Sequence, residues 1–248
     1  MITFDLKTLP DWETLAPGKH TLQIVAIAEN LIDSVNSDPI EFVREGPPDY
    51  LCFTAEEAGS TVAMAVNGTP TKGQAFETSI DGTNWSVFTP GTTTITLANA
   101  GDKVYFRGDN ITVSESSSIY YNFVMSGKIA ASGNIMSLLD KTCQSTTIPN
   151  DYCYYNMFYN CKSLTTAPVL PATTLARYCY SYMFNGCTSL QVYSSSGTGH
   201  TKAWRIPTSG SASSYTSQSN MFYNCPGSYT SSSIVDLNTT FYTQNTPV

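Results

Sequence analysis

The sequence is poor in charge and poor in histidine. Charged residues make up 12% of its 248 residues, about half the share usual in soluble domains. Residues 1–140 hold 7 basic and 17 acidic residues, and residues 141–248 hold 5 and 2, with no dense basic cluster in either part. Since nucleic-acid binding gathers Lys and Arg against phosphates, we expect no nucleic-acid partner.

A long apolar run is also missing. No window approaches the roughly 18 apolar residues that a membrane span requires, and residues 1–5 show neither a basic start nor an apolar stretch of signal-peptide length. A chain that begins natively at Met1 is therefore not expected to use the usual secretory route, which suits a phage virion protein released by lysis. A piece of a longer secreted protein would begin in the same way.

Catalytic motifs are absent. The two histidines, His20 and His200, lie in no recognised arrangement, and no phosphate loop or dinucleotide fingerprint occurs. Acidic residues such as Asp81 and Asp102 lie in predicted turns, where solvated carboxylates are the default, and Asp102 with Asp109 lacks the spacing of a calcium loop. We expect no enzymatic activity and no cofactor, with polysaccharide degradation as the weakest alternative.

What the sequence does contain is an internal repeat. Cys153, Met157-Phe158, Cys161 and Ser163-Leu164 recur 26 residues later as Cys179, Met183-Phe184, Cys187 and Ser189-Leu190, and Met221-Phe222-Tyr223-Asn224-Cys225 forms a third, partial copy. One copy cannot bury its Met, Phe, Leu and Cys alone, so the copies are expected to stack. Stacking would superpose the structural positions Phe158, Phe184 and Phe222 in one column, and Cys161, Cys187 and Cys225 in another.

The repeat motif resembles a known family. The pattern MFxxCxSL, with LPATTLA between two copies, is similar to the BspA-type leucine-rich repeats of bacterial and phage surface proteins, and the similarity covers roughly residues 136–230. The resemblance implies short strands along a curved solenoid, and adhesion or display in place of catalysis. It implies no catalytic residues.

Seven cysteines are present, and five lie at repeat positions. We expect them to be buried thiols that act as small hydrophobic residues. A disulfide such as Cys153–Cys179, which would need an oxidising compartment, and a zinc site are the alternatives.

The predicted fold is mainly β, in three parts. Residues 1–46 form an attachment segment, residues 50–132 a small antiparallel β module, and residues 133–248 a short leucine-rich-repeat-like solenoid with an insert at 193–219. Residues 16–43 resemble the last two strands of a fibronectin-III or immunoglobulin-like module, with strands expected at 19–28 and 38–43. Because a lone hairpin is marginal in water, we expect this segment to mediate homo-oligomerisation or docking onto a larger particle.

Alternating apolar residues predict the strands of the β module. They are expected at 51–54, 61–66, 76–80, 85–88, 93–97, 103–107, 119–125 and 128–131, with hairpin turns at Asn67-Gly68 and Asp81-Gly82. The apolar segment 134–139 would begin the first, incomplete repeat. The insert is expected to be an exposed loop, and the tail 238–248 a cap with a frayed end.

Tyrosine is abundant in the repeats, where 12 of the 16 tyrosines lie beyond residue 140. Tyr beside Ser, Gly and Asn is typical of recognition surfaces, so Tyr154, Tyr155, Tyr180 and Tyr182 are candidate contacts for a surface glycan or host protein. The alternative is that they cap the edges of the solenoid. Trp204, in the insert, is either a lid or a further contact. These features favour a non-enzymatic phage virion protein, a head or tail decoration or fibre, with a bacterial cell-surface adhesin as the alternative.

Overall fold

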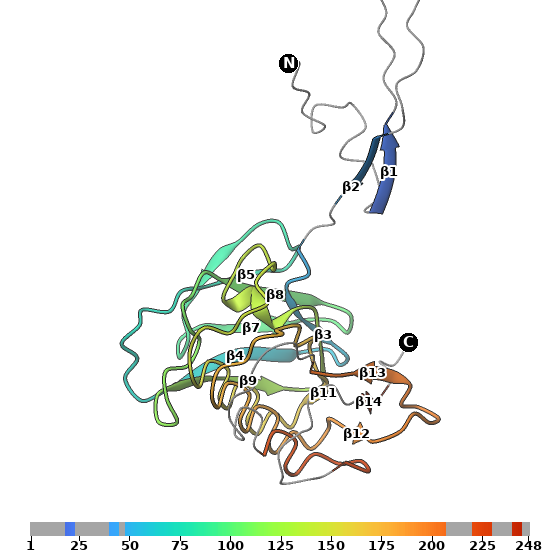
Figure 1. Ribbon diagram of the computed structural model, residues 1–248. Coiled ribbons are helices and arrows are strands. Elements are labelled where there is room, and N and C mark those ends of the chain that lie inside the picture. The colour runs from blue at the N-terminus through green and yellow to red at the C-terminus, as the bar shows by residue number, and fades with distance from the viewer. Residues whose placement is uncertain (1–17, 23–39, 45–47, 207–219, 230–239, 245–248) are drawn as a thin grey trace, which may run out of the picture. The chain divides into compact units, whose positions relative to one another are not determined.

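The computed structural model describes residues 18–22, 40–44, 48–206, 220–229 and 240–244 of the chain (Figure 1). The chain divides into two compact units, Met1–Pro48 and Asp49–Val248. In the first unit, β1 (Gly18–Leu22) and β2 (Ile40–Arg44) pair antiparallel, with Gly18 opposite Arg44 and Leu22 opposite Ile40. Both strands lie where the sequence predicts strands, and residues 23–28 of the first prediction lie outside the described residues.

The second unit begins with two β-sheets, ordered β11-β10-β3-β8-β5-β6 and β7-β4-β9. Phe53 and Phe106 from the larger sheet contact Phe123 of the smaller sheet edge-on, with ring centroids 4.7 and 5.2 Å apart, so the two sheets share one core. The strands are β3 (Leu51–Ala55), β4 (Ser60–Asn67), β5 (Phe76–Ser79), β6 (Ser86–Phe88), β7 (Thr94–Leu97), β8 (Lys103–Gly108), β9 (Tyr120–Ser126), β10 (Ile129–Ser132) and β11 (Leu164–Thr166).

One predicted hairpin is wrong. Asp81-Gly82 does connect the paired strands β5 and β6, but after Asn67-Gly68 the strand β4 pairs with β7 and β9 and not with β5. The chain instead passes through residues 69–75, whose backbone amides donate to side chains elsewhere in the module. These contacts carry the chain from the smaller sheet to the larger one, which a local turn signal does not reveal.

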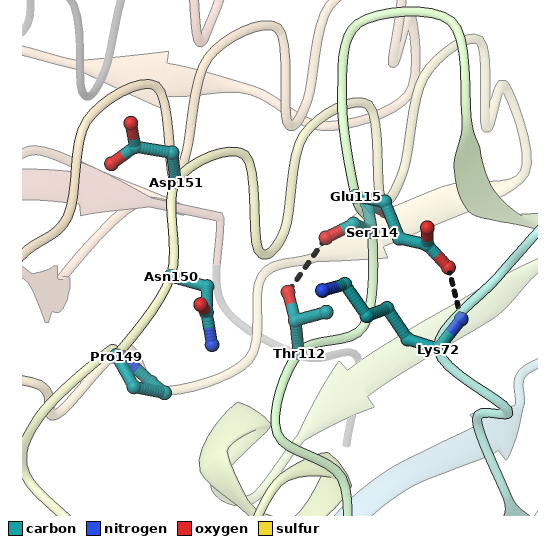
Figure 2. A pocket seen from close by; sticks show the side chains of 7 residues that line it. All are labelled: Lys72, Thr112, Ser114, Glu115, Pro149, Asn150 and Asp151. Carbon is teal, nitrogen blue, oxygen red and sulfur yellow. Dashed lines mark hydrogen bonds between the residues drawn. The ribbon is translucent and has the colours of Figure 1, made fainter.

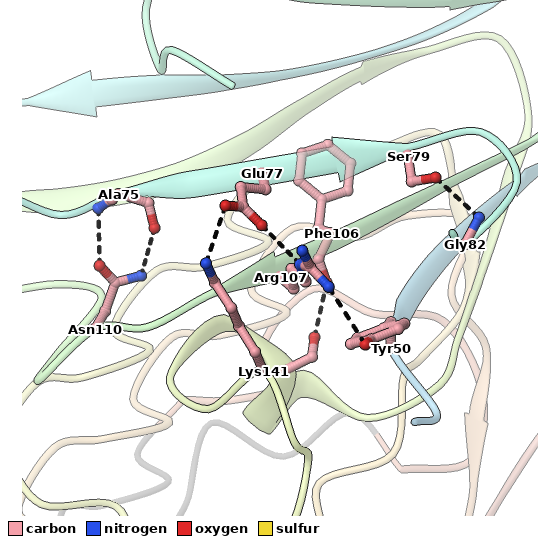
Figure 3. Close-up of polar contacts among 10 residues, drawn as sticks. Tyr50, Ala75, Glu77, Ser79, Gly82, Phe106, Arg107, Asn110 and Lys141 are labelled. Carbon is pink, nitrogen blue, oxygen red and sulfur yellow. Dashed lines mark hydrogen bonds and ion pairs between the residues drawn. The ribbon is translucent and has the colours of Figure 1, made fainter. Parts of the chain in front are cut away.

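An ion-pair cluster connects the module to the segment that leads into the repeats (Figure 3). Glu77 on β5 accepts from Arg107 Nε on β8 at 2.7 Å and from Lys141 Nζ at 2.9 Å, and these bonds hold the pKa of Glu77 below its ordinary value. The Arg107 guanidinium carbon lies 3.9 Å from the centre of the Trp85 ring. Three elements are thereby fixed around one carboxylate.

The predicted apolar segment 134–139 contains a short 3-10 helix, η3 (Ile135–Leu138), and the described residues include no α-helix. Asn134 caps it by accepting from the amide of Met136 at 2.8 Å. All four residues of η3 are buried, and the Ser137 hydroxyl donates to the Phe106 carbonyl at 2.8 Å while accepting from the Leu51 amide at 3.0 Å. This turn therefore belongs to the same core as the sheets.

From residue 151 onward the backbone forms tight turns whose amides alternate between two kinds of partner. The Tyr154 amide donates to the carbonyl of Cys179 in the next copy at 2.9 Å, whereas the Tyr155 amide donates back to Tyr152 at 2.9 Å. The second copy uses the third in the same way, with Phe184 donating to Met221 at 2.9 Å. Consecutive copies therefore lie side by side and are joined through their backbones.

The repeated phenylalanines form a stacked column. Ring centroids are 5.2 Å apart for Phe158 and Phe184 and 5.6 Å apart for Phe184 and Phe222, with the planes within 8°. Phe123 of β9 adds a ring below Phe158 at 5.4 Å, so the column begins in the β module. One hydrophobic cluster spans the residues predicted as module, 50–132, and those predicted as repeats, 133–248.

The repeated cysteines form a second column beside the rings. The thiols of Cys161, Cys187 and Cys225 donate to the carbonyls of Phe123, Phe158 and Phe184 at 3.0, 3.0 and 3.1 Å. All seven cysteines are free thiols, so Cys153 and Cys179 form no disulfide. The thiols of Cys187 and Cys225 thus contact the copy before their own, and the thiol of Cys161 contacts β9.

The predicted exposed loop at 193–219 is only partly right for the residues described, since residues 194–196, 198 and 199 are exposed but short strands form on either side of them. β12 (Val192–Tyr193), β13 (Lys202–Trp204) and β14 (Phe241–Thr243) form a sheet with β14 in the middle. Trp204 and Ile206 are buried, because β14 from the tail pairs with β13 and holds Trp204 edge-on to Phe222 at 5.3 Å. The sheet thus covers the last ring of the column, and residues 207–219 lie outside the described part of the chain.

Candidate binding surface

Five partly exposed tyrosines contact one another along the repeats and the end of β9. Tyr152 stacks on Tyr178 with ring centroids 4.8 Å apart and planes at 19°. Tyr155 lies edge-on to Tyr120, Tyr152 and Tyr182 at 5.8, 5.6 and 5.7 Å. We call this set, Tyr120, Tyr152, Tyr155, Tyr178 and Tyr182, the tyrosine surface. Its rings are held in place by one another, so they are presented with little freedom to lose on binding.

The backbone at three of these tyrosines is unusual. Tyr152, Tyr178 and Tyr182 have φ of 61°, 56° and 58°, a region that bulky residues rarely adopt and that costs about 1 kcal/mol or more per residue. The neighbouring left-handed position, by contrast, carries Asn160 in the first copy and Gly186 in the second, the residue types that tolerate it best. The positions equivalent to Tyr182 in the other copies, Asn156 and Asn220, have the same left-handed backbone, so this conformation belongs to the turns of the repeat.

Arg177 adds a positive charge at the edge of the tyrosine surface. Its guanidinium carbon lies 4.9 Å from the centre of the Tyr178 ring, and its Nη2 donates to the Tyr178 hydroxyl at 3.2 Å. Its backbone amide donates to Asp151 Oδ1 at 3.0 Å, and its carbonyl accepts from the Tyr152 amide at 2.9 Å. Arg177 therefore connects the two stacked tyrosines to the carboxylate of Asp151.

The hydroxyl of Tyr155 stays protonated near neutral pH. Burial raises the pKa of Tyr155, and the neighbouring Tyr182 and Tyr120 raise it further. A protonated phenol both donates and accepts one hydrogen bond. The surface therefore offers apolar ring area together with an uncharged hydrogen-bonding group at Tyr155.

Three of the five predicted contact residues are corrected. Tyr154 and Tyr180 are fully buried, with rings stacked at 5.9 Å in the core, and Trp204 is 6% exposed with its indole N–H donating to the Pro168 carbonyl at 2.9 Å. Buried rings cannot contact a ligand. The remaining two, Tyr155 and Tyr182, do lie at the surface.

Sequence reasoning missed Tyr120, Tyr152, Tyr178 and Arg177. The 26-residue repeat could have found two of them, because Tyr152 and Tyr178 occupy equivalent positions and stack as Phe158 and Phe184 do. Tyr120 comes from β9, outside the repeats, and the position equivalent to Arg177 in the first copy holds Asp151, a residue of opposite charge. Nothing in their local sequence marks these two residues.

The acidic residues considered as catalytic or calcium-binding candidates cap turns. Asp81 accepts from the amides of Asn84 and Thr83 at 2.7 and 2.8 Å, and these bonds, with the Asn84 side chain, lower its pKa. Asp102 accepts from the Asn99 amide at 2.9 Å. Within the described residues, no group of three or more His, Cys, Asp or Glu side chains could hold a metal ion. In the same residues, no helix has the length and apolar character needed to cross a bilayer.

Comparisons with protein families, with curated proteins and with solved structures found no match for the chain. The resemblance to BspA-type repeats therefore rests on the repeat motif alone. The functional argument has to come from the tyrosine surface and its surroundings.

Proposed function

We propose that this chain is a non-enzymatic surface protein that contacts a glycan or a host protein through the tyrosine surface. In this proposal the stacked copies form a short leucine-rich-repeat-like solenoid, and residues 1–46 attach it to a larger particle or to further copies of itself. The fold serves as a rigid support, and contact with the ligand takes place on the outside.

The observation that carries the proposal is the mutual packing of five partly exposed tyrosines, four of them on copies whose backbones are hydrogen-bonded to each other. Tyr152 and Tyr178 stack at 4.8 Å, and Tyr155 contacts three of the others. Rigid tyrosines give a large contact area at a small loss of conformational entropy, and aromatic faces suit the C–H faces of sugar rings. Together these properties favour recognition.

The proposed location is the surface of a phage virion, as a head or tail decoration or fibre. Its support is the similarity of the repeat motif to repeats of phage and bacterial surface proteins. A bacterial cell-surface adhesin is the alternative. Mass spectrometry of purified particles and of cell envelopes from the source distinguishes the two, since the chain should be enriched in only one of them.

Glycan-array binding of the full chain tests the proposed contact. A Tyr152→Ala/Tyr178→Ala variant should lose at least about tenfold in affinity, because it removes the stacked pair of rings from the surface. Tyr223→Ala is the matched control, since Tyr223 is 43% exposed but lies in the third copy, outside the tyrosine surface. Equal binding by the double variant and the wild type would contradict the proposal, provided that both melt at similar temperatures.

Polysaccharide degradation is tested with the same glycans. Incubation of the chain with each bound glycan should release no reducing ends. Release of reducing ends would show that the chain is an enzyme, and would contradict the proposed non-enzymatic role.

A further inference from the structure

A polar pocket of about 350 Å³ adjoins the tyrosine surface (Figure 2). Its lining comes from three segments distant in sequence and consists of Lys72, Thr112, Ser114, Glu115, Pro149, Asn150 and Asp151. Asp151 precedes Tyr152 in the chain and accepts from the Arg177 amide at 3.0 Å. The pocket and the tyrosine surface therefore meet at Asp151 and Tyr152.

One wall of the pocket is fixed by Glu115. Its carboxylate accepts from the Thr71 amide and hydroxyl at 2.7 and 2.6 Å, from the Lys72 amide at 2.8 Å and from Gln74 Nε2 at 3.1 Å. Desolvation opposes ionisation, yet these bonds bring the pKa of Glu115 down to about 2. Glu115 is thus occupied with holding the 71–74 segment and is not available to a ligand as a free base.

The opposite wall leaves Asn150 Oδ1 open toward Lys72, whereas the Asp151 carboxylate points away from the pocket (Figure 2). Asn150 uses its Nδ2 to donate to the Ile111 carbonyl at 2.6 Å, which fixes its side chain and leaves its Oδ1 without a protein partner in the described residues. Asp151 uses Oδ1 to accept from Arg177, and its Oδ2 has no partner in the same part of the chain. Both side chains are exposed at the rim.

Lys72 supplies the complementary donors. Its side chain runs across the pocket, and its ammonium group lies toward Thr112 (Figure 2). The Thr112 hydroxyl already donates to the Ser114 carbonyl at 2.6 Å. No described residue pairs with the Lys72 ammonium. The pocket therefore presents three N–H donors from Lys72 on one side and the Asn150 Oδ1 acceptor on the other.

We infer that this pocket binds a single neutral hexopyranose residue through two adjacent hydroxyl groups. A hydroxyl donates one hydrogen bond and accepts others, so one hydroxyl of a vicinal diol can donate to Asn150 Oδ1 while its neighbour accepts from the Lys72 ammonium on the other side of the pocket (Figure 2). A volume of about 350 Å³ is at the small end of ligand pockets and suits one sugar ring. The carboxylates of Asp151 and Glu115 disfavour an acidic sugar, and the Lys72 ammonium disfavours a cationic one.

This inference rests on the proposed glycan contact and specifies it. A sugar in the pocket would have its next residue beside Tyr152, where ring stacking can continue along the tyrosine surface. Hydrogen bonds in the pocket would select the sugar, and the tyrosines would extend the contact along the glycan.

The test is an amide NMR titration of the full chain with methyl glycosides of glucose, mannose and galactose. At least one should shift the amides of Lys72, Asn150 and Asp151, and analogues lacking one of the two adjacent hydroxyls should bind at least about tenfold more weakly. Lys72→Met should weaken binding similarly, whereas the exposed control Lys128→Met should not. The deoxy analogues test the two hydroxyl contacts with the unaltered protein, so their result does not depend on whether a variant folds.

Two results would overturn the inference. One is the absence of shifts at these amides with every neutral glycoside, and the other is binding of methyl glucuronide in preference to the neutral sugars. If longer glycans shift Tyr152 and Tyr178 but leave the pocket unchanged, the tyrosine contact stands and the pocket inference fails. If methyl glycosides shift the pocket while Tyr152→Ala/Tyr178→Ala binds longer glycans normally, the pocket stands and the tyrosine contact fails.

Discussion

The thiol of Cys187 donates to the carbonyl oxygen of Phe158 at 3.0 Å. The same carbonyl accepts the amide of Cys161 at 3.0 Å, so it closes the turn of its own copy and also receives the thiol of the next. Cys225 and Phe184 repeat the arrangement at 3.1 Å. A cysteine at this position therefore fills a small buried space and adds a directional contact between copies.

Substitutions of Cys187 separate these two roles. Cys187→Ala removes both the buried sulfur and the donor, and should lower the free energy of unfolding by about 1–2 kcal/mol. Cys187→Ser keeps a donor of similar shape and should lower it by less. Urea denaturation under reducing conditions measures the free energy of unfolding of both variants. Cys143→Ala, at a partly exposed site, is the control and should change this free energy little. A serine variant less stable than the alanine variant would show that the donor contributes nothing.

Alkaline pH should destabilise the fold through the buried thiols. Burial raises the pKa of Cys153 to about 11 and of Cys225 to about 12, and it also raises that of Cys187, against an ordinary value of 9.0. Because the unfolded chain loses these protons first, stability present below pH 9 is lost as the pH rises toward 12. The loss at pH 10 should be about 1.4 kcal/mol per buried thiol.

Urea denaturation at pH 7, 8, 9 and 10 measures this loss. Cys187→Ser should reduce the slope of stability against pH between 9 and 10 by about 1 kcal/mol per pH unit, because the unfolded thiol is already about half ionised at pH 9. Stability that stays constant from pH 9 to pH 10 would show that these thiols titrate alike in the folded and unfolded chain.

Much of the β module could be predicted from alternation, because successive residues of a strand face opposite sides of a sheet. In β8 the buried residues Val104 and Phe106 alternate with the more exposed Lys103 and Tyr105, so the position of the strand is visible in the sequence. The pairing of the strands cannot be predicted from local sequence, because β4 pairs with β9, whose residues lie more than 50 positions further along the chain.

The side chains of the repeats were harder to predict. The 26-residue period identifies equivalent residues such as Phe158 and Phe184, yet it does not say which members of Tyr152, Tyr154 and Tyr155 face the core. Left-handed residues recur at every fourth position from Tyr152 and reverse the local direction of the chain, so neither a period of 2 nor one of 3.6 applies. Tyr154 is therefore buried while its neighbour Tyr155 is partly exposed.

Attachment through residues 1–46 predicts a mass above that of one chain. Light scattering on the full chain should give a dimer or trimer of the 27.0 kDa subunit, because the β1–β2 hairpin of the first unit is marginal alone. A variant lacking residues 1–48 should be a monomer, since the second unit has its own core. Removal of residues 245–248 is the control and should leave the mass per particle unchanged. A full chain that is monomeric at all concentrations would contradict self-association, and docking onto a different particle would remain as the role of this segment.

Tyr154 and Tyr180 provide the sharpest comparison in the repeats, because their rings are stacked and equally buried but their hydroxyls differ. The Tyr154 hydroxyl donates to the Ile135 carbonyl at 3.2 Å, whereas the Tyr180 hydroxyl has no partner in the described residues. Tyr154→Phe should therefore lower the free energy of unfolding by about 1 kcal/mol. Tyr180→Phe removes a buried polar group without a hydrogen bond, and should leave stability unchanged or raise it by up to about 1 kcal/mol.

Urea denaturation of both variants at pH 7 measures the difference in the free energy of unfolding. Each variant is the control for the other, since each loses one oxygen atom from the same stacked pair of tyrosines. An equal loss of stability in the two variants would contradict the comparison. It would mean that the Tyr180 hydroxyl is hydrogen-bonded in solution, with a buried water as the simplest donor or acceptor.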